Sequence, residues 1–443
     1  MDGHALDRVG TNNPALTAPS QLLSGTHAQD NQDEPLSQFG FEQKQLRPTW
    51  RNWRNVVRNF SPSWFSVTMG TGITSLIFII LPFKSDCLYW LSVAFFALNT
   101  ILFFAALFIS ILRYVLYPEV WGAMIADSTN SLFLGTIPIG FSTLVESWIF
   151  LCAPYMGYWA VTFAWVCWII NCVVALAVTI SLTILLISAT HQQALHRITA
   201  AQLLPISATM VAAATGAEIA KFIQDPQVAL GTLLASYVMW GMAMPLSMTV
   251  LVMYYTRLAL HKLPPREVVV SSFLPLSPLG MGGYTILYLG TVSRDVFPRT
   301  QFFQGLPVAG EIFFILGAFI ALTMWGFGLI WLCFALASIY KSRPFPFNMG
   351  WWGFTFPLGA FAISTIELGT QMPSLFFRIL GTIFGMAVVL LWFVVTVGTV
   401  RGAVDGSLFM ASCVMHASKK TKDEEEAGEE EEEVIEEGEV GKC

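Results

Sequence analysis

Ten stretches of about twenty or more mainly apolar residues follow one another along this chain, and they restrict its fold more than any other feature of the sequence. The hydrocarbon core of a bilayer is about 30 Å thick and takes about 20 residues of α-helix to cross. The stretches cover approximately residues 62–83, 87–112, 123–150, 157–188, 200–223, 229–257, 271–292, 307–340, 350–370 and 374–400. Backbone groups find no hydrogen-bond partner in lipid, so such segments span as helices. We therefore predict an all-α polytopic membrane protein with ten transmembrane helices.

The composition agrees with burial in lipid. Charged residues make up 12% of the sequence, whereas soluble domains carry about 25%. Many of the acidic residues lie in one run, 423–443, so the net charge of −6 carries no information about a substrate. We expect a disordered cytoplasmic N-terminus (1–46), a ten-helix transmembrane transporter domain (47–402) and a cytoplasmic, acidic, disordered tail (403–443).

The basic residues predict the orientation. Lys and Arg concentrate before the first stretch, in the loops that follow even-numbered stretches, and in the tail. Cytoplasmic segments carry this excess in membrane proteins. Both termini are therefore expected in the cytoplasm, in agreement with an even number of helices.

Glycine and proline are concentrated in the odd-numbered stretches. A proline in a membrane helix frees a backbone carbonyl, which is tolerated where the helix is buried in protein or lines a wet cavity. We therefore expect five inner helices around a central pore and five outer helices around them, as five helical hairpins. The candidate pore-lining residues and helix breaks are Gly70, Thr71, Gly72, Gly135, Pro138, Pro205, Gly216, Pro278, Gly280 and Pro357. Close helix packing explains any one of them equally well, and for Gly381 and Gly385 internal packing and oligomer contact both remain open.

Few charged residues fall within the apolar stretches. Glu218 and Lys221, three residues apart, are the clearest candidates. They can neutralise one another on one helix face, or Lys221 can attract an anion at the mouth of a pore. The simpler alternative is a half-solvated pair near the extracellular end. Glu146, Glu311 and Glu367 also lie toward predicted outer ends, where we expect them to reach water.

Signs of catalysis are missing. All six histidines fall in predicted loops or termini, the cysteines form no C-x-x-C pair, and no phosphate loop or dinucleotide fingerprint occurs. We expect no enzyme activity, metal, cofactor or nucleic-acid partner, and a small inorganic or organic anion as the transported partner in the lipid bilayer.

A dense aromatic group begins the ninth stretch, in the run from Trp351 to Pro357. Trp351 and Trp352 suit an interfacial belt. Phe354 and Phe356 lie deeper, beside Pro357, where an aromatic ring can close a narrow path by excluding water.

The run from Phe60 to Ile73 (FSPSWFSVTMGTGI), the segment Tyr117–Trp121 and the run from Phe347 to Pro357 carry a family likeness. The chain resembles the tellurite-resistance/dicarboxylate transporter (TDT) family, closest to the fungal sulfite efflux pumps, and related to the slow-type anion channels. The resemblance implies five helical hairpins around a central pore, assembly as a homotrimer, and a phenylalanine gate on the ninth helix. The W-W-x-[FY]-x-F-P match assigns that gate to Phe356, with Phe354 as the second candidate.

Two segments depart from the sulfite-pump pattern and leave the substrate open. Ser277 and Met281 stand where Gly and Gln look usual, and Ala217-Glu218 replaces a second Gly and an apolar residue. We expect a plasma-membrane anion exporter for sulfite or bisulfite. The alternative is a transporter of malate or another organic acid, and import would then need proton coupling, with Glu218 as the participant. An embedded enzyme would need polar catalytic groups that converge at one depth, and the apolar stretches without histidine count against it. A receptor is the third hypothesis, in which the acidic tail binds partners, although such runs are usually only solvated and disordered.

Overall fold

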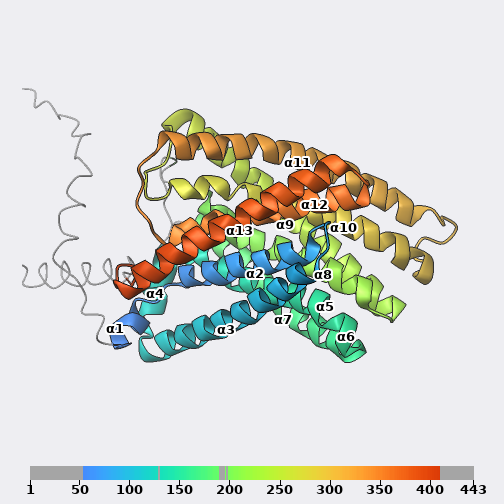
Figure 1. Ribbon diagram of the computed structural model, residues 1–443, viewed down its shortest axis with the longest axis horizontal. Helices are drawn as coiled ribbons and strands as arrows, with labels where there is room; N and C mark the ends of the chain where they lie inside the picture. Colours follow the sequence, from blue (N-terminus) through green and yellow to red (C-terminus); the bar gives the residue numbers. More distant parts are fainter. Residues whose placement is uncertain (1–52, 128–129, 189–194, 196–197, 410–443) are drawn as a thin grey trace, which may run out of the picture. The chain divides into compact units, whose positions relative to one another are not determined.

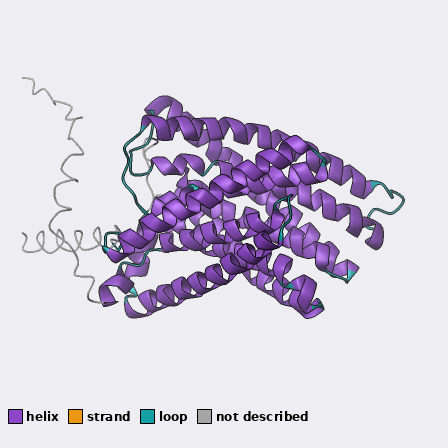
Figure 2. Ribbon diagram, in the orientation of Figure 1, coloured by secondary structure: helices purple, strands orange, loops and turns teal. Residues whose placement is uncertain are grey.

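The computed structural model describes residues 53–127, 130–188, 195 and 198–409, and these residues form helices and connecting turns without a strand (Figure 2). The predicted disordered terminus (1–46) and most of the acidic tail lie outside the described residues. The α-helices are α1 Trp53–Arg58, α2 Phe65–Ile80, α3 Asp86–Leu116, α4 Glu119–Ala126, α5 Thr136–Leu151, α6 Ala153–Met156, α7 Tyr158–Ile187, α8 Leu203–Phe222, α9 Pro226–His261, α10 Leu276–Thr300, α11 Ala309–Lys341, α12 Thr355–Gln371 and α13 Leu375–Val404.

Eight helical segments among these residues are long and apolar enough to cross a membrane. They contain α2, α3, α5, α7, α8, α9, α11 and α13. The two remaining predicted spans correspond to α10, which carries three charged residues near its end, and to α12, which has 17 residues. The polytopic all-α fold is confirmed, and the count of ten stays a prediction.

Burial divides the long helices into two alternating classes. The most apolar windows of α2 and α5 are 78% buried and that of α8 is 100% buried, whereas those of α3, α7, α9, α11 and α13 are 22–39% buried. In α10 and α12 the residues of the first turns and the middle are buried as well. Apolar outer helices that expose their side chains suit contact with lipid, while the inner helices contact protein.

The five inner helices form a closed ring. Each packs against the next in the order α2, α5, α8, α10, α12, and α12 packs back against α2. Each outer helix contacts its own inner helix and also the next one around the ring. Figure 1 shows the place where the ring closes: α2 lies beside α12 and α13, which come from the other end of the chain. There the Trp392 Nε1 of α13 donates to the Thr71 Oγ1 of α2 at 3.0 Å, across 321 residues of sequence.

Each inner helix begins with a short 3₁₀ turn. These turns are η3 Pro62–Trp64, η4 Ser131–Gly135, η7 Ala200–Gln202, η8 Val269–Phe273 and η9 Met349–Gly353. In four of the five helices a proline occupies the third α-helical position: Pro138, Pro205, Pro278 and Pro357. The first N–H groups of a helix have no intrahelical acceptor, so a proline there removes no hydrogen bond. The predicted breaks at these four prolines therefore lie in the first turns of their α-helices. After its proline, each of these α-helices continues without a break.

The predicted pore-lining glycines lie where helices touch. Gly70 faces Thr355 and Trp352, while Gly216 faces Trp168 and Ser236 of the outer helices. Gly72 meets Thr143 of α5, and a Cβ on Gly135 would lie 2.7 Å from the Leu204 carbonyl. In α13, Gly381 and Gly385 face Ile366 and Ile77, so the GxxxG motif serves internal packing.

Gly280 gives a direct test of this packing. A Cβ there would lie 2.6 Å from the Phe361 backbone nitrogen on α12. We expect Gly280→Ala to destabilise the protein by about 1–3 kcal/mol, because the added methyl must push two helix backbones apart. The measurement is the midpoint of thermal unfolding in detergent. Gly326→Ala, on the exposed side of α11 with no atom within 4 Å, is the control. Equal midpoints for the two variants would contradict close packing at Gly280.

Candidate functional site

A cavity of about 370 Å³ lies at one end of the ring, and we call it the mouth cavity. Every inner helix contributes to its wall, so it lies on the axis of the ring. Its lining residues are Ile79, Ile80, Pro82, Lys84, Phe150, Lys221, Tyr284, Tyr288, Glu367, Thr370, Gln371 and Arg378. On the predicted topology this end of the ring is extracellular.

Three cations surround the mouth cavity. The Lys84 ammonium donates to the Ile79 carbonyl at the end of α2, and burial lowers the pKa of Lys84. The Arg378 Nε donates to the Gly369 carbonyl at the end of α12 at 3.0 Å. The Lys221 Nζ lies 5.7 Å from the centre of the Tyr288 ring. Helix C-termini carry partial negative charge, which these cations offset, so that the mouth can accept an anion.

Buried carboxyl groups lie next to this cavity. Glu218 on α8 is 2% exposed, and its Oε1 accepts a hydrogen bond from the Tyr284 hydroxyl at 2.6 Å. Glu146 on α5 is 1% exposed, and its Oε1 accepts from the Thr215 hydroxyl at 2.8 Å. No ion pair joins Glu218 to Lys221 in the part of the chain that the structure describes. The prediction of a half-solvated Glu218–Lys221 pair is wrong, because Glu218 packs against α10 while Lys221 extends into the mouth cavity.

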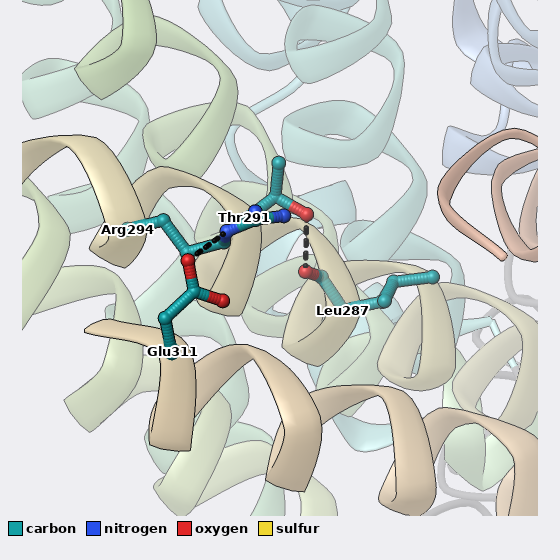
Figure 3. Close-up of polar contacts among 4 residues, drawn as sticks. All are labelled: Leu287, Thr291, Arg294 and Glu311. Atoms are coloured by element: carbon teal, nitrogen blue, oxygen red, sulfur yellow. Dashed lines mark hydrogen bonds and ion pairs between the residues drawn. The ribbon is translucent and has the colours of Figure 1, made fainter. Parts of the chain in front are cut away.

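The expectation that three further glutamates reach water holds for one of them. Glu311 is exposed and pairs with Arg294 at 3.1 Å, beside the Thr291–Leu287 hydrogen bond on α10 (Figure 3). Glu146 is buried, and Glu367 is 7% exposed and lines the mouth cavity. A position near a helix end was a poor guide here, because neighbouring helices cover the ends of inner helices.

The two candidate gate residues lie at the opposite end of the ring. Phe356 is 1% exposed in the first turn of α12. The Phe354 ring packs at 4.9 Å from Phe273 and at 5.6 Å from Trp351. Every residue of α8 from Leu203 to Ala220 is buried. No water-filled path therefore runs along α8 in this structure, and the interior of the ring is shut to water beside this helix.

Sequence reasoning missed several residues of the mouth cavity. Tyr284 and Tyr288 lie one turn apart on α10 and both reach the cavity. Their spacing of four residues was a usable signal, since residues four apart share a helix face. Lys84 and Arg378 were not among the candidate residues, because nothing in a linear sequence shows that the turn after α2 and the start of α13 meet at the end of a ring.

Comparison with known proteins gives consistent matches. Residues 59–400 match the model of a family described as voltage-dependent anion channel. The sulfite efflux pump of Arthroderma otae is 48% identical over 354 residues, which cover 80% of this chain and 93% of the relative. The sulfite efflux pump of Candida albicans is 27% identical over 391 residues, 82% of this chain and 78% of the relative. The malic acid transport protein of Schizosaccharomyces pombe is 25% identical over 363 residues, 76% of each.

The charge of Lys221 gives a prediction for the mouth cavity. An attraction of about 1 kcal/mol, as between unit charges about 4 Å apart in water, corresponds to about a fivefold effect on anion flux. We expect Lys221→Gln to lower flux by about that factor at low ionic strength, with a smaller loss at high salt because salt screens the charge. The measurement is anion flux in proteoliposomes at two salt concentrations. Arg294→Gln removes a charge outside the cavity and is the control. A salt-independent loss, or an equal loss in both variants, would contradict the assignment.

Proposed function

This chain belongs to the voltage-dependent anion channel family, and from that membership we propose that it exports an anion, sulfite or bisulfite, across the plasma membrane. The family and the named relatives are channels and transporters rather than enzymes. The observation that carries the choice of substrate is the 48% identity to a sulfite efflux pump, over 93% of that relative's length.

Export of this kind has a simple driving force. An inside-negative membrane potential favours outward movement of an anion by about 2.3 kcal/mol per charge per 100 mV. No cofactor is then required, and the protein needs only a path that anions tolerate. The ring offers buried hydroxyls along that path, such as Ser207 and Ser277, which approach to 3.3 Å between α8 and α10. The cations of the mouth cavity supply attraction at the end where the anion leaves.

Phe356 is our candidate for the gate of this path, with Phe354 second. The Phe356 side chain is buried, and it belongs to the first turn of α12, at the end of the ring opposite the mouth cavity. An apolar ring in a narrow path excludes water, and an ion cannot follow without its hydration. Phe354 has aromatic partners in η8 and η9 that hold it, which makes it the weaker candidate.

The pore residues that the sequence suggested form the rest of this proposal. Pro138, Pro205, Pro278 and Pro357 lie in the first turns of four inner helices, whose N-termini are at the gate end of the ring. Helix N-termini carry partial positive charge and attract anions. We propose that lipid covers the outer helices, and that the protein assembles as a homotrimer with both termini in the cytoplasm.

An organic-acid transporter is the second candidate. The 25% identity to a malic acid transport protein supports it, together with Glu218 at a position where the sulfite pumps look apolar. Proteoliposomes under an imposed potential separate the two functions. Potential-driven sulfite flux supports the exporter. Malate flux that needs a pH gradient, without sulfite flux, would replace it.

The gate gives a sharp prediction. We expect Phe356→Ala to raise potential-driven sulfite flux at least tenfold, because the truncated side chain no longer closes the path. Phe361→Ala is the matched control: Phe361 is equally buried on α12, but its ring stacks on Trp325 of the outer helix α11 at 5.9 Å. Both changes remove a buried ring at a similar cost in stability, about 3–5 kcal/mol.

Radiolabelled sulfite release from vesicles measures the effect, normalised to folded protein. A rise in Phe354→Ala alone would move the gate to Phe354. An equal rise in Phe356→Ala and Phe361→Ala would mean that general loosening, rather than a gate, explains the flux.

A further inference from the structure

The Glu218 carboxyl group has an oxygen without a partner. Its Oε1 accepts from the Tyr284 hydroxyl, whereas its Oε2 is buried and has no hydrogen-bond partner among the described atoms. An ionised carboxylate that is buried with one oxygen unpaired is costly, because neither water nor a protein donor replaces its lost hydration. Binding a proton is the direct way to remove that charge.

Two other acids face Glu218 across the inside of the ring. Glu146 comes from α5 and Glu367 from α12, and both repel a negative charge on Glu218. Helix α12 is not a ring neighbour of α8, so Glu367 acts through the interior. Lys221 opposes this repulsion from the same helix, but it extends into the mouth cavity and forms no ion pair with Glu218 among the described residues.

The remaining helices around α8 do not neutralise Glu218. Helix α7 carries no Asp, Glu, Lys, Arg or His, and its titratable groups are Tyr158, Cys167 and Cys172. Helix α9 contributes Tyr237, whose hydroxyl lies 3.0 Å from the Ser293 hydroxyl. On α10, Tyr284 and Tyr288 line the mouth cavity, and both are neutral phenols at ordinary pH.

Tyr284 connects Glu218 to the mouth cavity. It lines that cavity and also donates to the Glu218 Oε1. A phenol hydroxyl is both a donor and an acceptor, so it can pass a proton between water in the cavity and the buried carboxyl. Tyr288 lines the same cavity but makes no hydrogen bond with Glu218 among the described contacts.

Resting on the anion path proposed above, we propose that Glu218 is a proton-binding site, loaded from the mouth cavity through Tyr284, and that an anion passes only while Glu218 carries the proton. An ionised Glu218 beside Glu146 would repel an anion inside the ring. The protonated group leaves Lys84, Lys221 and Arg378 to dominate the charge at this end. Protons outside the mouth thus act as a ligand that opens the path to anions.

The test measures sulfite flux at fixed membrane potential while the pH on one side of the vesicle is varied. Changes in sulfite protonation affect every variant equally, so each flux is divided by that of Glu218→Gln, which is permanently neutral. We expect the wild-type ratio to fall as pH rises on the mouth side, approaching tenfold per pH unit. The exposed control Glu311→Gln should follow the wild type. Identical pH profiles for wild type and Glu218→Gln, or a folded Glu218→Gln without flux at any pH, would overturn the proposal.

The role of Tyr284 has a matched pair of variants. Tyr284→Phe removes the donor to Glu218 and should move the midpoint of the pH profile, whereas Tyr288→Phe should leave it unchanged. Equal behaviour of the two variants would remove Tyr284 from the proposal.

A readout without transport separates this inference from the proposed function. Infrared difference spectra of the purified protein should show the carbonyl stretch of a protonated carboxyl that disappears at high pH and is missing in Glu218→Gln. If the wild type carries no sulfite but shows this band, the proton site holds and the substrate is wrong. If it carries sulfite and the band is missing, the proton site is wrong and the exporter stands.

Discussion

The closed packing of five inner helices is the constraint on which the rest of this structure depends. Lipid cannot solvate carboxyl groups, so these groups persist in the membrane only where protein surrounds them. The ring provides that protein environment, and the glycines at its helix contacts let the backbones approach closely. The outer helices in turn can be almost purely apolar, because each has only to cover the groove between two inner helices.

Charge is distributed unequally between the two ends of the ring. Each inner helix starts with a 3₁₀ turn at one end and finishes at the mouth cavity side, so the helix dipoles reinforce one another. The N-terminal end thus attracts anions through its backbone N–H groups. The C-terminal end is negative by its dipoles, and by Glu218 whenever that group is ionised, and the cations Lys84, Lys221 and Arg378 offset this charge. The two ends of the proposed path therefore attract an anion by different physical means.

The sequence predicted the fold well, because the length of an apolar stretch and its glycine content can both be found within a short segment of sequence. The alternation of inner and outer helices was predicted from composition, and burial confirms it. The predicted helix break at Pro138 falls in the first turn of α5, directly after the 3₁₀ turn η4, and the sequence pattern did not specify this change of helix type. The site was less predictable, since the hydrogen bond of Glu218 with Tyr284 joins residues 66 positions apart. Only the ring order, which no local pattern contains, brings α8 and α10 together.

The contact that closes the ring joins α2 with the last hairpin, as the Trp392–Thr71 hydrogen bond illustrates. A ribosome delivers α2 to the membrane long before α12 and α13 exist. During that interval Thr71 lacks its donor Trp392, the side of α2 that later packs against α12 and α13 has no protein neighbour, and a shortened chain ends as an open arc. Until the last hairpin is made, the first inner helix thus has one side without its final protein neighbours, and truncated products that never gain them are expected targets for membrane quality control.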